Sequence, residues 1–264
     1  LPEYGWEASV IAASVELNTG RQRLESGESY RIDCFSGIPF LWIRTPQYRG
    51  NGAGRLFNML VFSGRVLRRR NTRDLPRPDL VIGSSVHPFA AAAGLILARR
   101  HRVPFVFEVR DLWPQTLVDM GRMAEGALLV RVLRKLERHL YRRAAKIVVL
   151  LPHAADYIVP LGIPPARIQW IPNGVDLRLF PESPLPDRSP GEPFTLMYFG
   201  AHGHANGLDT VMEAMKLVQA DPGGTAVRLR LIGDGERKPA LEAFARNHGL
   251  KNVSFEPPVP KNQI

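Results

Sequence analysis

The chain has 264 residues, 45% hydrophobic and 23% charged, a globular composition with enough length for two domains. Its single cysteine, Cys34, excludes an internal disulfide and a cysteine cluster for a metal, and it favours a reducing compartment. The longest apolar run, Phe89 to Ala98, is far shorter than the roughly 20 residues that cross a bilayer.

The net charge of +10 lies entirely in the first part of the chain. Residues 1–178 hold 26 Lys and Arg against 15 Asp and Glu, a balance of +11, whereas residues 179–264 hold 9 against 10, a balance of −1. Such a basic surface attracts polyanions, which leaves nucleic acid and the anionic face of a membrane open as partners.

Apolar runs and helical patterns alternate regularly along the first part of the chain. Short apolar runs predict strands at Ala8–Val15, Ile38–Ile43, Asp79–Ser85, Val103–Phe107 and Ile147–Leu151, and another within Arg167–Asp176. Helical spacing predicts helices at Leu56–Arg70, Phe89–Arg100 and Glu125–Lys146. This alternation is typical of an α/β domain with a doubly wound parallel sheet.

Two of these helices carry apolar residues at helical spacing, which predicts their buried faces. In the first helix they are Phe57, Leu60, Val61 and Leu67. In the third they are Leu128, Leu129, Val132, Leu133, Leu136 and Leu140, and arginines cover the rest. A helix of this kind usually packs its stripe on the sheet, and less often lies on a membrane surface.

The segment VPFVFEVRDLWP at Val103–Pro114 contains the first candidate site. A densely apolar run predicts a fully buried strand, and Glu108, Arg110 and Asp111 follow where that strand leaves the sheet. In open α/β sheets, ligands bind beyond the carboxyl ends of the strands. The residues therefore indicate either a ligand site or an Arg110–Asp111 ion pair that holds a loop.

A proline-rich stretch, PESPLPDRSPGEP at 181–193, has the composition of a linker and predicts a domain boundary. It separates a first domain at 1–180 from a second at 194–264. In the second domain the pattern predicts strands at Phe194–Phe199, Val227–Ile232 and Val253–Phe255, and helices at Leu208–Val218 and Pro239–Asn247. Three strands and two helices make about half of a second doubly wound domain.

Two turns between a strand and a helix are rich in glycine: GAHGHANG at Gly200–Gly207 and GDGERK at Gly233–Lys238. Such turns allow a close approach of the backbone, and the N–H groups of the following helix can hold phosphate. Neither matches the dinucleotide fingerprint or the P-loop. His202 and His204 have no carboxylate or cysteine at ligand spacing, so no metal site is expected.

Four ordered motifs covering nearly the whole chain carry a family resemblance. They are VFEVRDLWP, RIQWIPNGVD, MYFGAHGHANGLDTVMEAM and LRLIGDGERKPALEAFARNHGLKNVSFEPPVP. Together they resemble the GT-B glycosyltransferases of the family 4 type, especially the bacterial aminosugar transferases of surface polysaccharide synthesis, such as the L-fucosamine transferases. The resemblance implies two Rossmann-like domains with doubly wound parallel sheets, the second only partly present.

The resemblance also implies an activity and its partners. The expected reaction moves a sugar, an N-acetylated aminosugar, from a nucleotide-diphosphate donor, UDP-linked, to a lipid-linked or saccharide acceptor with retention. No metal and no further cofactor are expected, because positive groups and helix N-termini stabilise the leaving diphosphate.

The expected site residues are assigned by position in these motifs. Glu108, Arg110, Asp111 and His87 would face the sugar and acceptor from the first domain. The donor diphosphate would lie near Gly200, His202, Asn206, Gly207, Gly233, Gly235 and Lys238.

Some features depart from the family pattern. Arg110 stands where many members have histidine, and Asn206 stands where a lysine is usual, so fewer fixed cations would face the diphosphate. Members also have a strand and a glycine-rich loop before the position of Leu1, and a paired-glutamate motif after that of Ile264. The chain is therefore expected to be a piece of a longer protein, with activity in doubt for these residues alone.

A lipid-linked acceptor would explain the charge asymmetry, because a basic first domain can dock on anionic lipid. The expected location is therefore the cytoplasmic face of the cell membrane, with peripheral attachment. Alternatives from other classes are a sugar-nucleotide epimerase or hydrolase on the same fold, a catalytically silent fragment, and a basic nucleic-acid-binding module. The arginines are not interleaved with stacking aromatic residues, which argues against nucleic acid.

Overall fold

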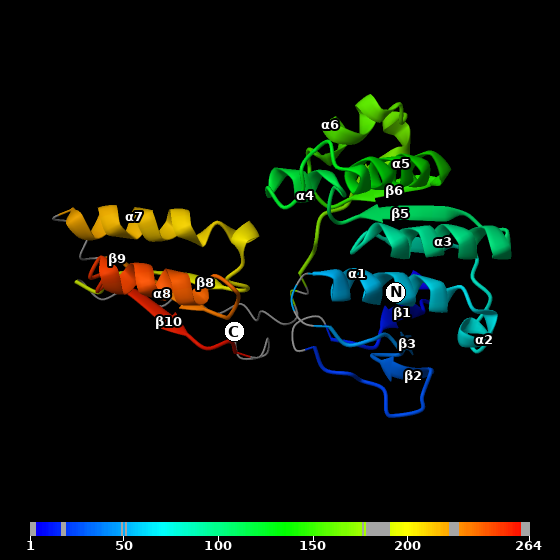
Figure 1. Ribbon diagram of the computed structural model, residues 1–264, viewed down its shortest axis with the longest axis horizontal. Helices are drawn as coiled ribbons and strands as arrows, with labels where there is room; N and C mark the ends of the chain where they lie inside the picture. Colours follow the sequence, from blue (N-terminus) through cyan, green and yellow to red (C-terminus); the bar gives the residue numbers. More distant parts are fainter. Residues whose placement is uncertain are drawn as a thin grey trace. The chain divides into compact units, whose positions relative to one another are not determined.

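The structure, a computed structural model, describes residues 4–16, 20–48, 50, 52–175, 177, 191–221 and 227–259. The chain divides into two compact units, Leu1–Val175 and Asp176–Ile264, which we call unit 1 and unit 2 (Figure 1). Most of the linker predicted at 181–193 lies outside the described residues.

Unit 1 begins with a three-stranded sheet of order β1-β3-β2. Its strands are β1 (Val10–Ala13), β2 (Tyr30–Phe35) and β3 (Ile38–Ile43). β1 is parallel to β3, and β2 pairs antiparallel with β3. Sequence analysis missed β2. Ser36 and Gly37 both have positive φ, 50° and 78°, which is the backbone of a tight hairpin turn.

The second sheet of unit 1 is four-stranded and wholly parallel, with the order β4-β5-β6-β7. Its strands are β4 (Val81–Ser84), β5 (Phe105–Val109), β6 (Lys146–Val149) and β7 (Ile168–Trp170). Between them run α3 (Pro88–His101) and α5 (Leu128–Arg143), together with the short helices α4 (Gln115–Asp119) and α6 (Ala154–Ile158). The predicted α/β class with parallel sheets is confirmed.

The core of this sheet lies between the strands and the two long helices. Its buried residues include Phe105, Phe107, Leu140, Tyr141 and Ile147. Phe105 and Phe107 are both buried on β5, with the half-buried Val106 between them, because successive residues of a strand point to opposite faces. A second cluster, centred on Leu41 and Phe62, joins the first sheet to α1 (Ala53–Val66) and α3.

The predicted buried faces of two helices are wrong in detail. α1 buries Asn58, Met59, Phe62 and Val66. Phe57 and Leu60, both predicted to be buried, are 60% and 47% exposed. The short helix α2 (Arg69–Thr72) follows α1. α5 buries Val130, Leu133, Glu137, Leu140 and Tyr141. It leaves Leu128, Leu129 and Val132 exposed. The leucine pattern misled because Glu137 occupies the centre of the true buried face, where two tyrosines satisfy its carboxylate.

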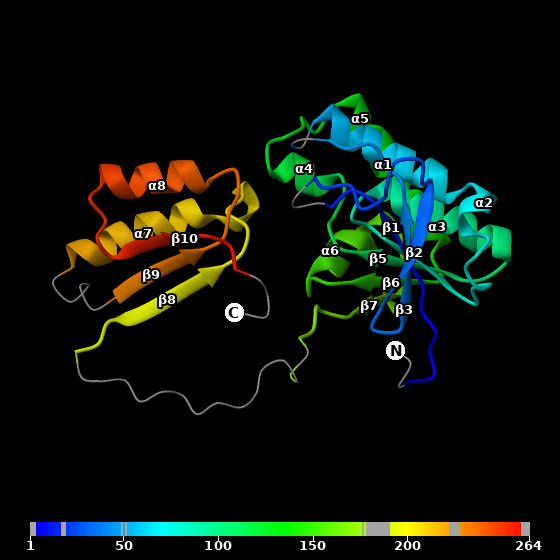
Figure 2. The ribbon, with the colours of Figure 1, turned by 90° about the horizontal axis from the view of Figure 1, so that it is seen from below.

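Unit 2 is a three-stranded parallel sheet of order β10-β9-β8 with two helices on one face (Figure 2). Its elements are β8 (Phe194–Phe199), α7 (Leu208–Ala220), β9 (Val227–Ile232), α8 (Lys238–Asn247) and β10 (Val253–Glu256). Leu208, Met212 and Met215 of α7 and Leu241 of α8 pack on Leu231 of β9. Within the described residues, no helix has both the length and the apolar character that a bilayer-spanning segment needs.

Candidate functional site

In unit 1, two glycines set the position of α3 against β4. A Cβ on Gly83 would lie 2.7 Å from the Phe105 ring and 3.0 Å from the Ala91 Cα, so only glycine fits there. A Cβ on Gly94 would lie 3.2 Å from the Gly83 Cα. This close packing brings the start of α3, and with it His87, to the carboxyl end of β4.

His87 is the N-cap of α3, and its Nδ1 accepts a hydrogen bond of 3.1 Å from the Ala90 N–H. The ring is 8% exposed and contacts the rings of Phe62 and Phe89. Burial, and after it the charge of Arg55, lowers the pKa of His87 to about 4. His87 is therefore neutral near pH 7, and because Nδ1 accepts the capping bond, the proton belongs on Nε2.

Ser85 ties the loop after β5 to the end of β4. Its buried Oγ accepts a hydrogen bond of 2.9 Å from the Arg110 N–H, and its own N–H donates to the Glu108 carbonyl at 2.9 Å. Sequence reasoning did not single out Ser85. Its position as the last residue of a predicted strand, where polar side chains reach the edge of the sheet, was the available signal.

The predicted residues of unit 1 therefore lie at one edge of the parallel sheet. Glu108 is half-buried near the end of β5, and Arg110 and Asp111 are exposed in the loop that follows. Among the described residues, no ion pair joins Arg110 to Asp111, so the interpretation as an ion-paired loop does not hold. The edge presents two carboxylates, one guanidinium and the neutral imidazole of His87, groups that can bind sugar hydroxyls and polarise them.

In unit 2, the two glycine turns pack directly against each other at the carboxyl edge of the sheet. A Cβ on Gly233, whose φ is +147°, would overlap the carbonyl oxygen of Gly200. A Cβ on Gly235 would lie 2.5 Å from the carbonyl oxygen of His202. The turns are also hydrogen-bonded, because the His202 N–H donates to Asp234 and the Arg237 N–H donates to His202, each at 2.9 Å.

His202 occupies the centre of this arrangement and is 0% exposed. Both of its ring nitrogens lack a hydrogen-bond partner within the described part of the chain. Burial, and after it the charge of Lys238, lowers the pKa of His202. The side chain is thus a neutral, packed imidazole between the two turns.

Asn206 and Gly207 form the entry to α7. The Asn206 Oδ1 accepts a hydrogen bond of 3.2 Å from the Gly203 N–H, and Gly207 has a left-handed backbone with φ +62°. The first N–H groups of a helix lack partners within the helix, and its N-terminus carries partial positive charge. The exposed turn can therefore take an anion.

Lys238 has a different environment from the one expected of a phosphate-binding lysine. Its ammonium donates to the carbonyl oxygens of Gly233 at 2.7 Å and Glu256 at 2.9 Å. It thereby joins the ends of β9 and β10, and its ammonium group is engaged by backbone carbonyls. Within the described ranges, no group of three or more His, Cys, Asp or Glu side chains has the geometry to hold a metal ion.

Residues 1–174 match the family model described as a glycosyl transferase 4-like domain. This chain belongs to that family. A putative colanic acid biosynthesis glycosyl transferase of Escherichia coli K12, WcaI, is 21% identical over 195 residues, covering 69% of this chain and 46% of WcaI. A probable glycosyltransferase of Pseudomonas aeruginosa, WbjE, is 23% identical over 209 residues, covering 76% of this chain and 48% of WbjE.

Solved structures match the fold at low sequence identity. A sucrose-phosphate synthase of Thermosynechococcus elongatus has a TM-score of 0.70 at 15% identity, covering 99% of this chain and 63% of that one. Anabaena HepE, solved with UDP and glucose, has a TM-score of 0.56 at 16% identity, covering 85% of this chain and 57% of HepE. The fold is that of the GT-B glycosyltransferases, and the chain spans about half the length of the curated relatives it matches.

Proposed function

We propose that the protein transfers a sugar from a UDP-linked donor to a lipid-linked or saccharide acceptor, with retention, in the synthesis of a cell-surface polysaccharide. In this proposal the sugar is an N-acetylated aminosugar, and no metal or further cofactor takes part. Family membership and the two curated relatives support a transferase of polysaccharide synthesis. The geometry of unit 2 supports a diphosphate-bearing donor.

The observation that carries the proposal is the contact between the two glycine turns through His202. Because neither Gly200 nor Gly233 has a Cβ, their backbones pack closely, and this brings the N-termini of α7 and α8 to one edge of the sheet. When the bond between the sugar and the diphosphate breaks, negative charge develops on the leaving UDP. Prearranged N–H groups and helix dipoles stabilise such charge without reorganisation.

In this scheme unit 1 supplies the acceptor side. The carboxylates of Glu108 and Asp111 accept hydrogen bonds from sugar or acceptor hydroxyls, and Arg110 and the Nε2–H of His87 donate. The bond from the anomeric carbon to the UDP oxygen breaks, and a bond to the acceptor oxygen forms. The acceptor hydroxyl proton leaves with the UDP or to water, so the step requires no oxidant.

Donor binding is tested with a matched pair of charge variants. Asn206→Asp keeps the Oδ1 acceptor for Gly203 and places a negative charge at the start of α7, so it should weaken UDP binding about tenfold. Asn247→Asp makes the same change at the exposed far end of α8 and should leave the affinity unaltered. Isothermal titration measures the UDP affinity of both variants. If the parent chain does not bind UDP at millimolar concentration, the donor assignment is refuted.

Transfer is tested separately from binding. Asp111→Asn should lower the rate of transfer by about 10- to 100-fold, the scale of a lost hydrogen bond between a substrate hydroxyl and a charged group, with UDP affinity unchanged. Asp119→Asn, an exposed carboxylate at the end of α4, is the control. Product that forms without added acceptor would favour the alternative of an epimerase or hydrolase.

The proposal includes peripheral attachment to the cytoplasmic face of the cell membrane. The exposed side of α5 supports it, because Leu128 and Val132, 71% and 53% exposed, lie beside the exposed cations Arg131 and Lys135. Replacing both cations by glutamine should reduce flotation with phosphatidylglycerol vesicles. Equal binding of the parent chain to neutral and anionic vesicles would contradict this attachment.

A further inference from the structure

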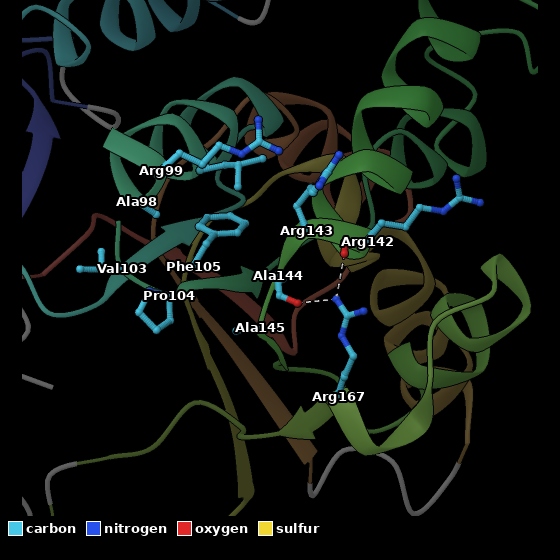
Figure 3. Close-up of a pocket in the computed structure, with 11 residues that line it drawn as sticks. Ala98, Arg99, Val103, Pro104, Phe105, Arg142, Arg143, Ala144, Ala145 and Arg167 are labelled. Atoms are coloured by element: carbon cyan, nitrogen blue, oxygen red, sulfur yellow. Dashed lines mark hydrogen bonds between the residues drawn. The ribbon is translucent and has the colours of Figure 1, made fainter. Parts of the chain in front are cut away.

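A basic pocket lies at the amino edge of the four-stranded sheet in unit 1, the edge opposite to Glu108, Arg110 and Asp111 (Figure 3). It is open and has a volume of about 460 Å³. Its lining comes from the last turns of α3 and α5 and from the first residues of β5 and the segment before β6. The lining residues are Leu95, Ala98, Arg99, Val103, Pro104, Phe105, Arg142, Arg143, Ala144, Ala145 and Arg167.

The four charged residues of this lining are all arginines, and the other seven residues are apolar. Figure 3 shows Arg99 and Arg143 extending on the same side of the Phe105 ring, from different helices, while Arg142 points away. Among the described residues, neither Arg99 nor Arg143 makes an ion pair. Their guanidinium groups are thus available to a ligand.

Arg167 has a structural task that explains why the pocket keeps its shape. Its guanidinium donates to the carbonyl oxygen of Tyr141 at 2.7 Å. It also donates to the carbonyl oxygens of Arg142, at 3.3 Å, and Ala144 (Figure 3). These are the carbonyls at the end of α5, which lack partners within the helix. Arg167 therefore holds the end of α5 in place at the pocket, and Arg99 and Arg143 are not needed for this task.

Arginine near a helix C-terminus is favoured by the helix dipole, so the charge balance decides whether a ligand is needed. The C-terminal ends of α3 and α5 contribute about −0.5 each, a sum of about −1. Arg99 and Arg143, which extend into the pocket, contribute about +2, and the lining has no carboxylate. The dipoles thus offset about half of this positive charge, and an excess of about +1 remains for an anion.

We infer that this pocket binds a phosphate group, through Arg99 and Arg143, at a site separate from the candidate donor and acceptor sites. The planar guanidinium fork matches phosphate oxygens with paired charge-assisted hydrogen bonds. The volume lies within the range of about 300–1,000 Å³ that is usual for small-ligand sites. The phosphate belongs either to a soluble phosphorylated compound or to the headgroup of an anionic lipid.

The first experiment uses inorganic pyrophosphate as the probe on the chain labelled with ¹⁵N, in 150 mM salt, where diffuse attraction is screened beyond about 8 Å. The side-chain Nε–H signals of Arg99 and Arg143 should shift and saturate. Signals of Gly203 and Gly207 report independently on the glycine turns of unit 2, so this outcome does not depend on the proposed donor site. Absence of saturable shifts at Arg99 and Arg143 would overturn the inference.

The second experiment compares two double variants with equal charge change. Arg99→Gln with Arg143→Gln should weaken pyrophosphate binding to the unit 1 site at least tenfold. Arg69→Gln with Arg70→Gln removes two exposed arginines of α2, outside the pocket, and should leave that affinity within twofold. Equal losses in both would mean general charge attraction and overturn the inference; circular dichroism verifies that both variants fold.

Vesicles distinguish the two sources of phosphate. If the pocket takes a lipid headgroup, the Arg99 and Arg143 variant loses flotation with phosphatidylglycerol vesicles as well as pyrophosphate binding. If it takes a soluble compound, the variant loses pyrophosphate binding alone. Loss of flotation with pyrophosphate binding intact would contradict the pocket, because surface charge alone would then explain the effect.

Discussion

Gly233 lies so close to Gly200 that a Cβ on Gly233 would overlap the Gly200 carbonyl oxygen. The two residues end neighbouring parallel strands, and the Gly200 N–H also donates to the Ile232 carbonyl, directly before Gly233, at 3.0 Å. The two glycine turns are therefore one structural unit. Their glycines serve close packing of backbone on backbone, in addition to any role with a ligand.

Gly233→Ala should destabilise unit 2 by roughly 2–4 kcal/mol, because the methyl group meets backbone that cannot move aside and φ is positive. The four tryptophans, Trp6, Trp42, Trp113 and Trp170, all lie in unit 1 and report its unfolding alone. Circular dichroism should show an early transition that tryptophan fluorescence does not.

Gly203→Ala is the matched control for this prediction. Its Cβ would lie 3.2 Å from the Asn206 Oδ1, at the end of a side chain that can shift, and its backbone has φ −102°. The expected cost is below about 1 kcal/mol. If both variants unfold alike, close packing at Gly233 is not what stabilises the turns.

The parallel architecture could be predicted from the sequence because each buried strand is a short apolar run that ends in glycine or polar residues. The β2 strand was missed although Tyr30, Ile32 and Cys34 alternate with Arg31 and Asp33, because this mixed pattern contains few apolar residues. The Ser36-Gly37 turn after it was the stronger signal.

The candidate site was predictable in location but not in detail. The rule that ligands bind beyond the carboxyl ends of strands placed Glu108, Arg110 and Asp111 at one edge, and the family resemblance added His87. It could not reveal that Lys238 donates to the backbone of Gly233 and Glu256, since both contacts depend on tertiary packing. Roles of these residues in binding and transfer stay predictions.

Glu137→Gln should remove the contribution of this carboxyl group to the pH dependence of the stability of unit 1. Burial raises the pKa of Glu137 to about 7, against the opposing effects of Tyr141, Tyr157, Arg134 and Arg138. The folded state thus holds its proton more tightly than the unfolded state, whose pKa is 4.5. Stability from this group is full below pH 4.5 and is lost as pH rises through about 7, by as much as about 3 kcal/mol.

At pH 8 the glutamine variant should therefore be more stable than the parent chain, with the tyrosine hydroxyls still partly satisfied by the amide. Denaturant unfolding followed by tryptophan fluorescence measures this. Glu125→Gln, whose side chain is 70% exposed, should not change the pH profile. A glutamine variant less stable than the parent at pH 8 would show that the charged carboxylate contributes net stability.

His87→Asn should change the pH profile in the opposite direction. The pKa of His87 is lowered from 6.5 to about 4, so the unfolded state takes up a proton first as the pH falls. Stability from this group is full above pH 6.5 and is lost as pH falls toward 4, again by up to about 3 kcal/mol. Asparagine retains a capping oxygen and does not titrate.

The two groups almost cancel between pH 4.5 and 6.5, so the parent chain should have a nearly flat profile there. Unfolding of His87→Asn by denaturant should then show stability that falls with pH, and Glu137→Gln stability that rises. Parallel profiles for the two variants would contradict the assigned directions of both pKa shifts.

Ser85→Ala should loosen the loop that carries Arg110 and Asp111. The variant leaves the Arg110 N–H without its acceptor, which costs about 1–3 kcal/mol where the group stays shielded from water. Hydrogen exchange at the Arg110 amide should accelerate as well.

Ser84→Ala, one residue earlier, is the control. The Ser84 Oγ is buried without a partner in the described structure, so its removal should be neutral or stabilising. Equal effects of the two substitutions would mean that volume, and not the hydrogen bond to Arg110, determines the stability of this edge.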